Sequence, residues 1–268
     1  MLEVCFFEMK DAPKALIVIP ARLASTRLPG KPLVDLEGKP MILHVLTRAM
    51  QANIAPVVVA CADQEIAKAV QEAGGQAVWI EHPVPTGSDI VYEAVQRLDP
   101  QGHIPYILNV QGDLPVFDPS LLVALLDPFD QDPSVDVVTP VVRQQHQGEV
   151  MSPHVVKVQF QSSPEARSGC VWEKAIGFSR KPYTSLLDLW YQHVGVYAYR
   201  RDALKRFVHA PQSVSEQQEK LEQLRALDLG MHIAGVVVDV DIPLSVDTPQ
   251  DLEKVRQYLV HASGLRVA

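Results

Sequence analysis

Short apolar runs alternate with helical patterns along the first half of the chain, and this alternation constrains the fold more than any other feature. The runs are short and rich in β-branched residues, which is typical of buried strands. They cover residues 15–19, 56–61, 76–80, 106–110 and 135–142. Helical patterns follow, with start signals at Pro40, Asp63, Thr86 and Asp118. Strands that alternate with helices predict an α/β fold with a doubly wound, mainly parallel sheet, whose ligands bind beyond the C-terminal strand ends.

The pattern changes after residue 148. Further strands are predicted at 155–160, 193–199 and 232–240, and helices at 215–229 and 250–260. We interpret 1–268 as a single domain and residues 143–200 as an insertion within it. The aromatic residues of the insertion favour a subunit-contact lobe and a homodimer; they are Trp172, Phe178, Trp190 and Tyr191. The alternative is a small separate core beneath a long loop.

A basic loop follows the first predicted strand. It runs from Pro20 to Leu33 and contains Arg22, Arg27 and Lys31 with no carboxylate between them. Arginine grips phosphate oxygens in pairs and lysine adds a point charge, so the loop is a candidate phosphate-binding site. It is not a Walker A loop, because the Gly-Lys pair is followed by proline. The alternative is a solvated basic loop.

Composition limits the classes of partner. The chain has 268 residues and a net charge of −8, which argues against binding to nucleic acid or to an anionic membrane. Its three cysteines are far apart, so neither a disulfide framework nor a zinc site is expected. No apolar run approaches the ~18 residues of a membrane span. Residues 1–14 carry three carboxylates and do not form an export signal, so we expect a cytoplasmic protein.

Two carboxylates extend the candidate phosphate site. Asp113 directly follows a predicted buried strand, and Asp247 follows apolar chain near the C-terminus. Alone, Asp113 could be a turn residue and Asp247 a plain helix cap. Beside a phosphate-binding loop they are typical of a magnesium–nucleotide site, because Mg²⁺ takes one or two carboxylates together with water and phosphate oxygens. Asp239 and Asp241 are alternative ligands.

Several sequence blocks carry a family resemblance. In order they are P-A-R-L-A-S-T-R-L-P-G-K-P-L at 20–33, Q-G-D-L-P at 111–115, H-V-V-K-V at 154–158, F-S-R at 178–180, H-V-G-V-Y-A-Y-R at 193–200, L-E-Q-L-R at 221–225 and V-D-T-P-Q-D-L-E at 246–253. The chain resembles the 3-deoxy-manno-octulosonate (Kdo) cytidylyltransferases, also called CMP-Kdo synthetases. The resemblance implies a Rossmann-like nucleotidyltransferase fold.

The resemblance also implies an activity: CTP and Kdo would give CMP-Kdo and pyrophosphate, supplying lipopolysaccharide assembly. It assigns the CTP phosphates to the basic loop, Mg²⁺ to Asp113 and Asp247, and the cytosine and ribose to Thr86, Gly87 and Ser88. Catalysis would depend on Mg²⁺, Arg22, Arg27, Lys31 and Asp113.

For the sugar acid, the resemblance implies a pocket lined by Gln111, Arg180, His193, Tyr197, Glu222 and Gln223. Taken alone, the His and Tyr could be ordinary strand residues and the Glu-Gln pair solvated helix positions. Two residues depart from the family pattern: Ile90 follows the Thr-Gly-Ser-Asp turn, where the family has an arginine nearby, and Leu114 replaces a glutamate. The same chemistry on an 8-amino-Kdo or a nonulosonic acid, and a nucleotide-binding paralogue without turnover, are therefore alternatives.

Overall fold

A computed structural model describes residues 13–25, 27–144, 150–162, 171–182 and 190–264 of the chain. These residues fall into two compact units. Unit 1 joins residues 1–119 to 243–268, and unit 2 is residues 120–242. No helix in the described residues is both long and apolar enough to cross a bilayer. The division of the chain into one domain with an insertion at 143–200 stays a prediction.

Unit 1 contains the predicted parallel sheet. Its strands are β1 (Ala15–Ala21), β4 (Val57–Cys61), β5 (Ala77–Trp79) and β6 (Tyr106–Val110). They lie in the order β6-β1-β4-β5, and every pairing is parallel. The central strand β1 is buried along its whole length, as a strand with neighbours on both sides requires. Cys61 is also fully buried and belongs to the core.

Three helices pack against this sheet: α1 (Met41–Gln51), α2 (Gln64–Glu72) and α3 (Gly87–Leu98). The start of α3 is a capping box, in which Thr86 accepts a hydrogen bond from Asp89 N and the Asp89 carboxylate accepts one from Thr86 N. Alternating strands and helices therefore form the α/β arrangement predicted for this half of the chain.

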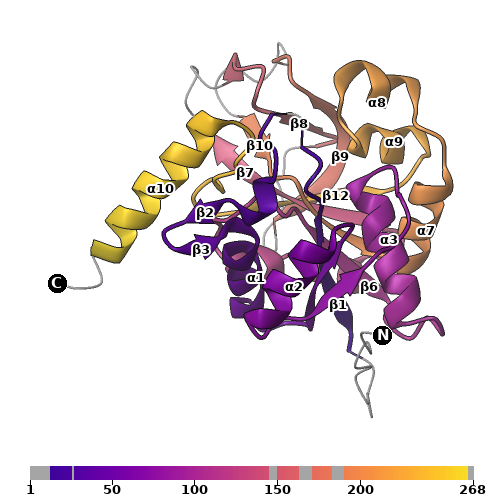
Figure 1. Ribbon diagram of the computed structural model, residues 1–268. Coiled ribbons are helices and arrows are strands. Elements are labelled where there is room, and N and C mark those ends of the chain that lie inside the picture. The colour runs from indigo at the N-terminus through magenta and orange to yellow at the C-terminus, as the bar shows by residue number, and fades with distance from the viewer. Residues whose placement is uncertain (1–12, 26, 145–149, 163–170, 183–189, 265–268) are drawn as a thin grey trace. The chain divides into compact units, whose positions relative to one another are not determined.

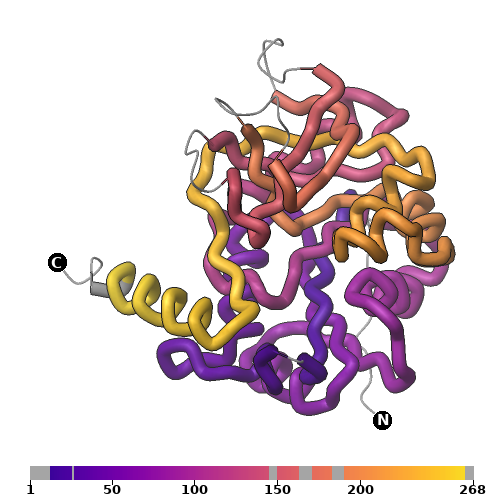
Figure 2. Tube along the Cα trace, turned by 90° about the horizontal axis from the view of Figure 1, so that it is seen from above, coloured from indigo at the N-terminus to yellow at the C-terminus, as the bar shows by residue number. Residues whose placement is uncertain are grey.

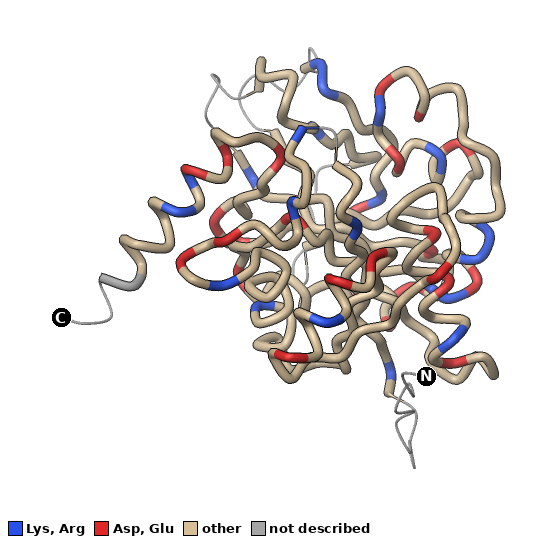
Figure 3. The backbone as a smooth tube through the Cα atoms, viewed as in Figure 1, with Lys and Arg blue, Asp and Glu red and all other residues tan. Residues whose placement is uncertain are grey.

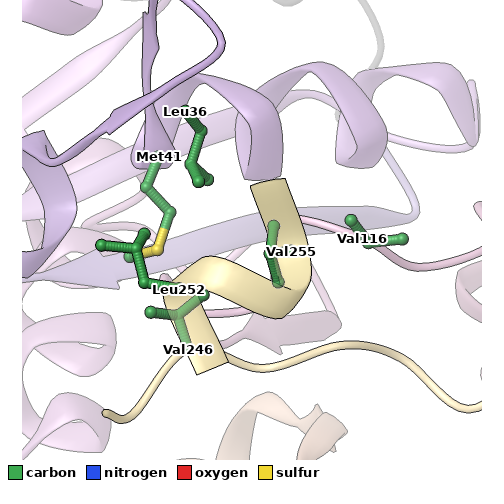
Figure 4. Close-up of a cluster of buried hydrophobic side chains, with 6 residues drawn as sticks. All are labelled: Leu36, Met41, Val116, Val246, Leu252 and Val255. Atoms are coloured by element: carbon green, nitrogen blue, oxygen red, sulfur yellow. The ribbon is translucent and has the colours of Figure 1, made fainter. Parts of the chain in front are cut away.

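The C-terminal segment completes unit 1. Val246 N donates to Asp113 O over 2.9 Å, and a β-bridge joins Val116 to Leu244. Helix α10 (Pro249–Gly264) then lies beside the hairpin of β2 (Asp35–Leu36) and β3 (Lys39–Pro40) (Figures 1 and 2). Side chains from both ends of the chain form one apolar cluster (Figure 4). It consists of Leu36, Met41, Val116, Val246, Leu252 and Val255.

Unit 2 contains a mixed sheet. Its strands are β7 (Val137–Gln144), β8 (Lys157–Phe160), β9 (Trp172–Ser179), β10 (Trp190–His193), β11 (Val196–Arg200) and β12 (Ile233–Val238). The pairings run β10-β8-β9-β12-β7 and return from β7 to β10, which closes a ring. Only β7 and β12 pair in parallel among the registers of this unit's described strands. The mainly parallel sheet therefore describes unit 1 and not unit 2.

The helices of unit 2 are shorter than predicted. They are α4 (Ser120–Val123), α5 (Asp127–Gln131), α7 (Arg201–His209), α8 (Val214–Glu219) and α9 (Gln223–Asp228). The single helix expected at 215–229 is broken at Lys220, which adopts a left-handed conformation (φ 56°) that ends α8. The break accompanies a buried ion pair in which Arg225 contacts both carboxylate oxygens of Glu216, at 2.6 and 2.8 Å.

The single strand expected at 193–199 is also divided. Both β10 and β11 run antiparallel to β7, but His193 pairs with Val141 and Ala198 with Val138. The five residue steps from His193 to Ala198 therefore lie opposite the three steps from Val141 to Val138 on β7. The two extra residues form a bulge, which bends the strand and turns its backbone carbonyls toward β7.

Candidate active site

A cavity of about 360 Å³ lies at the C-terminal ends of β1 and β6 in unit 1. It is lined by the predicted basic loop, the residues after β6 and the segment before α10. The lining residues are Pro20, Ala21, Arg22, Ala24, Ser25, Arg27, Lys31, Pro32, Gly87, Ile90, Gln111, Gly112, Asp113 and Asp247. Six predicted site residues from the first half of the chain therefore line the same cavity as Asp247, which lies near the C-terminus.

Lys31 connects the two predicted metal ligands. It lies in the 3-10 helix η1 (Lys31–Leu33), and its ammonium contacts Asp113 Oδ2 at 2.8 Å and Asp247 Oδ1 at 3.2 Å. Burial alone would lower the pKa of Lys31, but the charges and hydrogen bonds of the two carboxylates outweigh burial and raise it. Lys31 is therefore a permanent cation shared between two acidic side chains.

The two arginines of the loop are less constrained. Arg27 Nη2 lies 3.0 Å from Asp247 Oδ1, with 64% of its side chain exposed. Arg22 Nη1 donates to the backbone oxygen of Pro85 over 3.2 Å and is also exposed. Both guanidinium groups can turn toward an anion in the cavity. Figure 3 shows that Lys and Arg are elsewhere interspersed with Asp and Glu along the described chain.

Asp247 is not the cap of the last helix. That role belongs to Thr248, whose hydroxyl accepts a hydrogen bond from Asp251 N while the Asp251 carboxylate accepts one from Thr248 N. The Asp247 carboxylate is thereby available to Lys31 and Arg27. The plain-cap interpretation of Asp247 is wrong, because the adjacent threonine performs the capping.

Asp63 is a site-supporting residue that the sequence interpretation took for a helix cap. It stands at the start of α2, but its Oδ2 accepts a hydrogen bond from Leu23 N over 2.6 Å. This contact holds the backbone next to Arg22 in place. Nothing in the local sequence distinguishes such a carboxylate from an ordinary N-cap, because its partner lies 40 residues earlier.

Gly112 sets the depth of the cavity. A Cβ atom at this position would lie 2.6 Å from the backbone oxygen of Pro20, which is closer than a carbon atom can approach an oxygen without a clash. The chain after β6 and the C-terminal end of β1 therefore touch through their backbones. This contact brings Asp113 within reach of the basic loop.

The segment predicted to bind cytosine and ribose is divided between roles. Gly87 lines the cavity. The Thr86 side chain takes part in the capping box of α3 and donates to Asp89 Oδ2 at 2.7 Å. Ser88 is 1% exposed, and its hydroxyl has no hydrogen-bond partner among the residues that the structure describes. Of the three, only glycine contributes to the cavity wall.

Three predicted sugar-binding residues lie together in unit 2. The rings of His193 and Tyr197 have centroids 5.5 Å apart, and the Tyr197 hydroxyl donates to Gln223 Oε1 over 3.2 Å. Burial, and then the negative charge of Glu222, raise the pKa of Tyr197, so its hydroxyl stays protonated. Gln223 is 5% exposed, and its Nε2 has no hydrogen-bond partner within the described part of the chain.

Arg180 and Gln111 make contacts of their own. Arg180 follows β9, and its Nη1 donates to the backbone oxygen of Pro153 over 3.2 Å. Its own backbone oxygen accepts a 2.6 Å hydrogen bond from the buried ammonium of Lys157, which fixes the end of β9. Gln111 lines the cavity of unit 1 and donates to Asn109 Oδ1 over 3.2 Å.

Asp113 and Asp247 suit a divalent cation of the magnesium type. Their oxygens already share one cationic atom, Lys31 Nζ, and carboxylate oxygen is the ligand that Mg²⁺ prefers. Within the described ranges no group of three or more His, Cys, Asp or Glu side chains is arranged to hold a metal. A pair is sufficient where water and phosphate oxygens complete the coordination.

Comparison with known proteins agrees with this geometry. A family model described as cytidylyltransferase matches residues 16–233. The 3-deoxy-manno-octulosonate cytidylyltransferase of Paramagnetospirillum magneticum is 50% identical over 244 residues, which cover 91% of this chain and 97% of the relative. The enzyme of that name from Rhodospirillum centenum is 49% identical over 261 residues, or 97% and 99% of the two chains.

A solved structure is also similar. It is that of a CMP:2-keto-3-deoxy-manno-octonic acid synthetase complexed with CTP, which has a TM-score of 0.81 and 38% identity and covers 93% of this chain and 99% of its own. Fold and cavity thus define a nucleotidyltransferase of the cytidylyltransferase class. Within that class, the chain belongs to the 3-deoxy-manno-octulosonate cytidylyltransferase family. The predicted family, its α/β nucleotidyltransferase fold and its enzyme class are confirmed.

Proposed function

We propose that this protein joins CTP to Kdo, which yields CMP-Kdo and pyrophosphate. One observation carries the proposal: Arg22, Arg27 and Lys31 line a single cavity with Asp113 and Asp247, in a chain about half identical to enzymes named for this reaction. Cations for a triphosphate and a carboxylate pair for a metal are what nucleotidyl transfer needs.

The reaction would be a direct displacement. The anomeric hydroxyl of Kdo attacks the α-phosphorus of CTP, the bond to the β-phosphate breaks, the hydroxyl proton leaves, and pyrophosphate departs. The protein positions the two substrates and neutralises charge. Arg22, Arg27 and Lys31 bind phosphate oxygens, whereas the segment Thr86–Ser88, of which Gly87 lines the cavity, is assigned to the cytosine and ribose. No covalent enzyme intermediate is required.

Mg²⁺ is the proposed cofactor, held by Asp113 and Asp247. When bound, it would withdraw charge from the phosphate oxygens and lower the pKa of the attacking hydroxyl. Lys31 and Arg27 already contact these carboxylates and hold them at the cavity. Their positive charge limits the repulsion between the acidic pair and an incoming triphosphate.

The sugar acid is assigned to the residues of unit 2 together with Gln111. Arg180 supplies a planar fork for the Kdo carboxylate. His193, Tyr197 and Gln223 supply neutral hydrogen-bonding groups for hydroxyls, and Glu222 adds an acceptor. Gln223 Nε2 has no partner among the described residues and supports this assignment, since a buried donor without a partner costs free energy until a ligand satisfies it.

A homodimer formed through residues 143–200 is also proposed, in the cytoplasm where CTP is available. The four aromatic residues first taken as interface candidates are between 1% and 8% exposed within the subunit, so they form its core. Among the residues of this segment that the structure describes, Met151 (65% exposed) and Ile176 (47% exposed) are large apolar side chains open to a partner. Light scattering at micromolar concentration that gives a monomer mass would reject the dimer.

Pyrophosphate release tests the activity. With CTP, Mg²⁺ and a panel of Kdo, 8-amino-Kdo and a nonulosonic acid, we expect turnover that is fastest with Kdo. The rate with UTP or ATP should be far lower, because a wrong base leaves buried polar groups unpaired. Thermal stabilisation by CTP without pyrophosphate release would instead identify a binding protein.

A further inference from the structure

The bulge between β10 and β11 surrounds one buried threonine. Thr139 lies on β7, has no exposed surface, and faces the two extra residues of the bulge. One backbone hydrogen bond, from Val194 N to Pro140 O at 3.0 Å, joins the bulge to β7, and another, from Val196 N to Val194 O at 2.7 Å, closes a tight turn within it. The surroundings of Thr139 are therefore fixed by the backbone.

Three polar atoms approach the Thr139 hydroxyl. They are the backbone oxygens of Val196 at 2.8 Å and Val194 at 3.2 Å, and the Nε2 atom of His193 at 2.9 Å. A hydroxyl has one proton to donate, and a carbonyl can only accept. Two oxygens 2.8 Å apart with no proton between them repel each other, so the proton points to the carbonyls. The hydroxyl oxygen must then accept a hydrogen bond from the imidazole.

This assignment decides the state of the imidazole. Burial lowers the pKa of His193 to about 3, so the ring is neutral near neutral pH. Phe178 and Tyr197 flank the ring, with centroids 5.1 and 5.5 Å from that of His193. A neutral imidazole has one N–H and one lone pair. If Nε2 carries the proton, Nδ1 carries the lone pair.

We propose that Thr139 is a positioning residue that holds His193 in the Nε2–H tautomer, so that His193 Nδ1 accepts a hydrogen bond from a hydroxyl group of the sugar acid. The choice of ligand rests on the proposed function, whereas the tautomer does not. The lone pair of His193 Nδ1 repels a carboxylate or a keto oxygen, because both groups carry only acceptor atoms. Thr139, which does not itself contact the substrate, therefore contributes to the choice between a hydroxyl and an oxo group.

The first test reads the tautomer directly. Two-bond ¹⁵N–¹H correlation spectra of the full-length protein, with His193 assigned by its absence in His193→Gln, report which ring nitrogen carries the proton. We expect Nε2–H in the wild type and in Thr139→Ser, which keeps the hydroxyl. Thr139→Val has the same shape without the hydroxyl, and its ring should shift toward Nδ1–H. A wild-type ring protonated at Nδ1 overturns the proposal, even if the valine variant does not fold.

The second test measures the KM for the sugar acid. Thr139→Val should raise the KM for Kdo about tenfold, which corresponds to about 1.4 kcal/mol, with kcat and the Kd for CTP nearly unchanged. Thr139→Ser should stay within about threefold of the wild type, since it retains the hydrogen bond. Equal KM values in all three proteins, or equal losses in the serine and valine variants, contradict the proposal. If the wild type turns over no sugar acid, the proposed function fails, and the spectra still decide the tautomer.

Discussion

The two sets of candidate substrate-binding residues are built in opposite ways. In unit 1, charged side chains gather around a cavity and stay partly open to solvent: Arg27 is 64% and Asp247 42% exposed. In unit 2, apart from the charged groups of Arg180 and Glu222, the candidates are neutral, and Tyr197 and Gln223 are buried (8% and 5% exposed) and share one neutral hydrogen bond. Charge recognises phosphate over a range of geometries, whereas a neutral hydrogen bond needs its donor and acceptor held in place. We infer that unit 1 supplies reactivity and unit 2 supplies selectivity.

The carboxylate pair should give the largest effect. Asp113→Asn and Asp247→Asn each remove one charge from the proposed metal site, and we expect kcat to fall by about 100-fold or more. Steady-state pyrophosphate release over a Mg²⁺ titration measures the loss. Asp35→Asn is the matched control, because its carboxylate is exposed and accepts a local hydrogen bond from Gly38 N. Near wild-type turnover at limiting Mg²⁺ in either site variant would remove that residue from the metal site.

Lys31→Ala should weaken nucleotide binding and leave the KM for Kdo nearly unchanged. The loss of one ion contact costs roughly 1.5–3 kcal/mol, which corresponds to about a 10- to 150-fold weaker Kd for CTP. Calorimetry with CTP and Mg²⁺ in the absence of sugar measures this loss. Lys68→Ala is the control, since the ion pair between Lys68 and Glu72 is exposed and lies on a different segment from the basic loop. Unchanged CTP affinity would break the assignment of phosphate binding to the basic loop.

Arg180→Ala should affect the sugar acid and not the nucleotide. The KM for Kdo should rise about tenfold, by the same contact cost, while CTP binding stays nearly unchanged. Arg180→Lys should recover only part of the loss, because a lysine cannot supply the planar fork. Kinetics in Kdo and calorimetry with CTP separate the two substrates. Weakened CTP binding with an unchanged KM for Kdo would place Arg180 on the nucleotide.

Tyr197→Phe should have the smallest effect. It removes one neutral hydrogen bond to Gln223 without changing the packing, so we expect the KM for Kdo to rise about three- to tenfold. Tyr258→Phe on the exposed face of α10 serves as the control. A larger loss of kcat than of apparent Kdo affinity would show that Tyr197 contributes to reactivity and would blur the contrast between the two sets.

The parallel half of the fold was predictable because its signals are local. The expected strand at 106–110 matches β6 at both ends, and the expected strand at 56–61 differs from β4 by one residue. Buried parallel strands are continuous apolar runs, and such runs can be read without knowing their neighbours. The capping residue Thr86 was found for the same reason, since its partner Asp89 lies three residues away.

The missed features depend on partners that are distant in sequence. Strand β9 was not predicted, because its outward residues are only partly polar and its pairing with β12 lies 60 residues away. A lysine is not a residue type that indicates a left-handed helix end. The helix break at Lys220 accompanies the Glu216–Arg225 ion pair, which the sequence does not reveal. Among the site residues, the charged loop could be recognised from composition. The role of Asp63 and the bulge around Thr139 could not, because each is defined by a contact across the fold.

Unit 1 is built from two segments that are separated in the sequence by residues 120–242, so the ribosome completes them at different times. Asp247 follows Asp113 by 134 residues, so at about 5–20 residues per second a ribosome needs roughly 7–27 s to supply the second carboxylate after the first. During that interval Leu36, Met41 and Val116 lack the α10 side chains that cover them. The nascent chain must carry this apolar surface while residues 120–242 emerge. Slow translation of that segment would lengthen the exposure, and chaperone demand should rise with it.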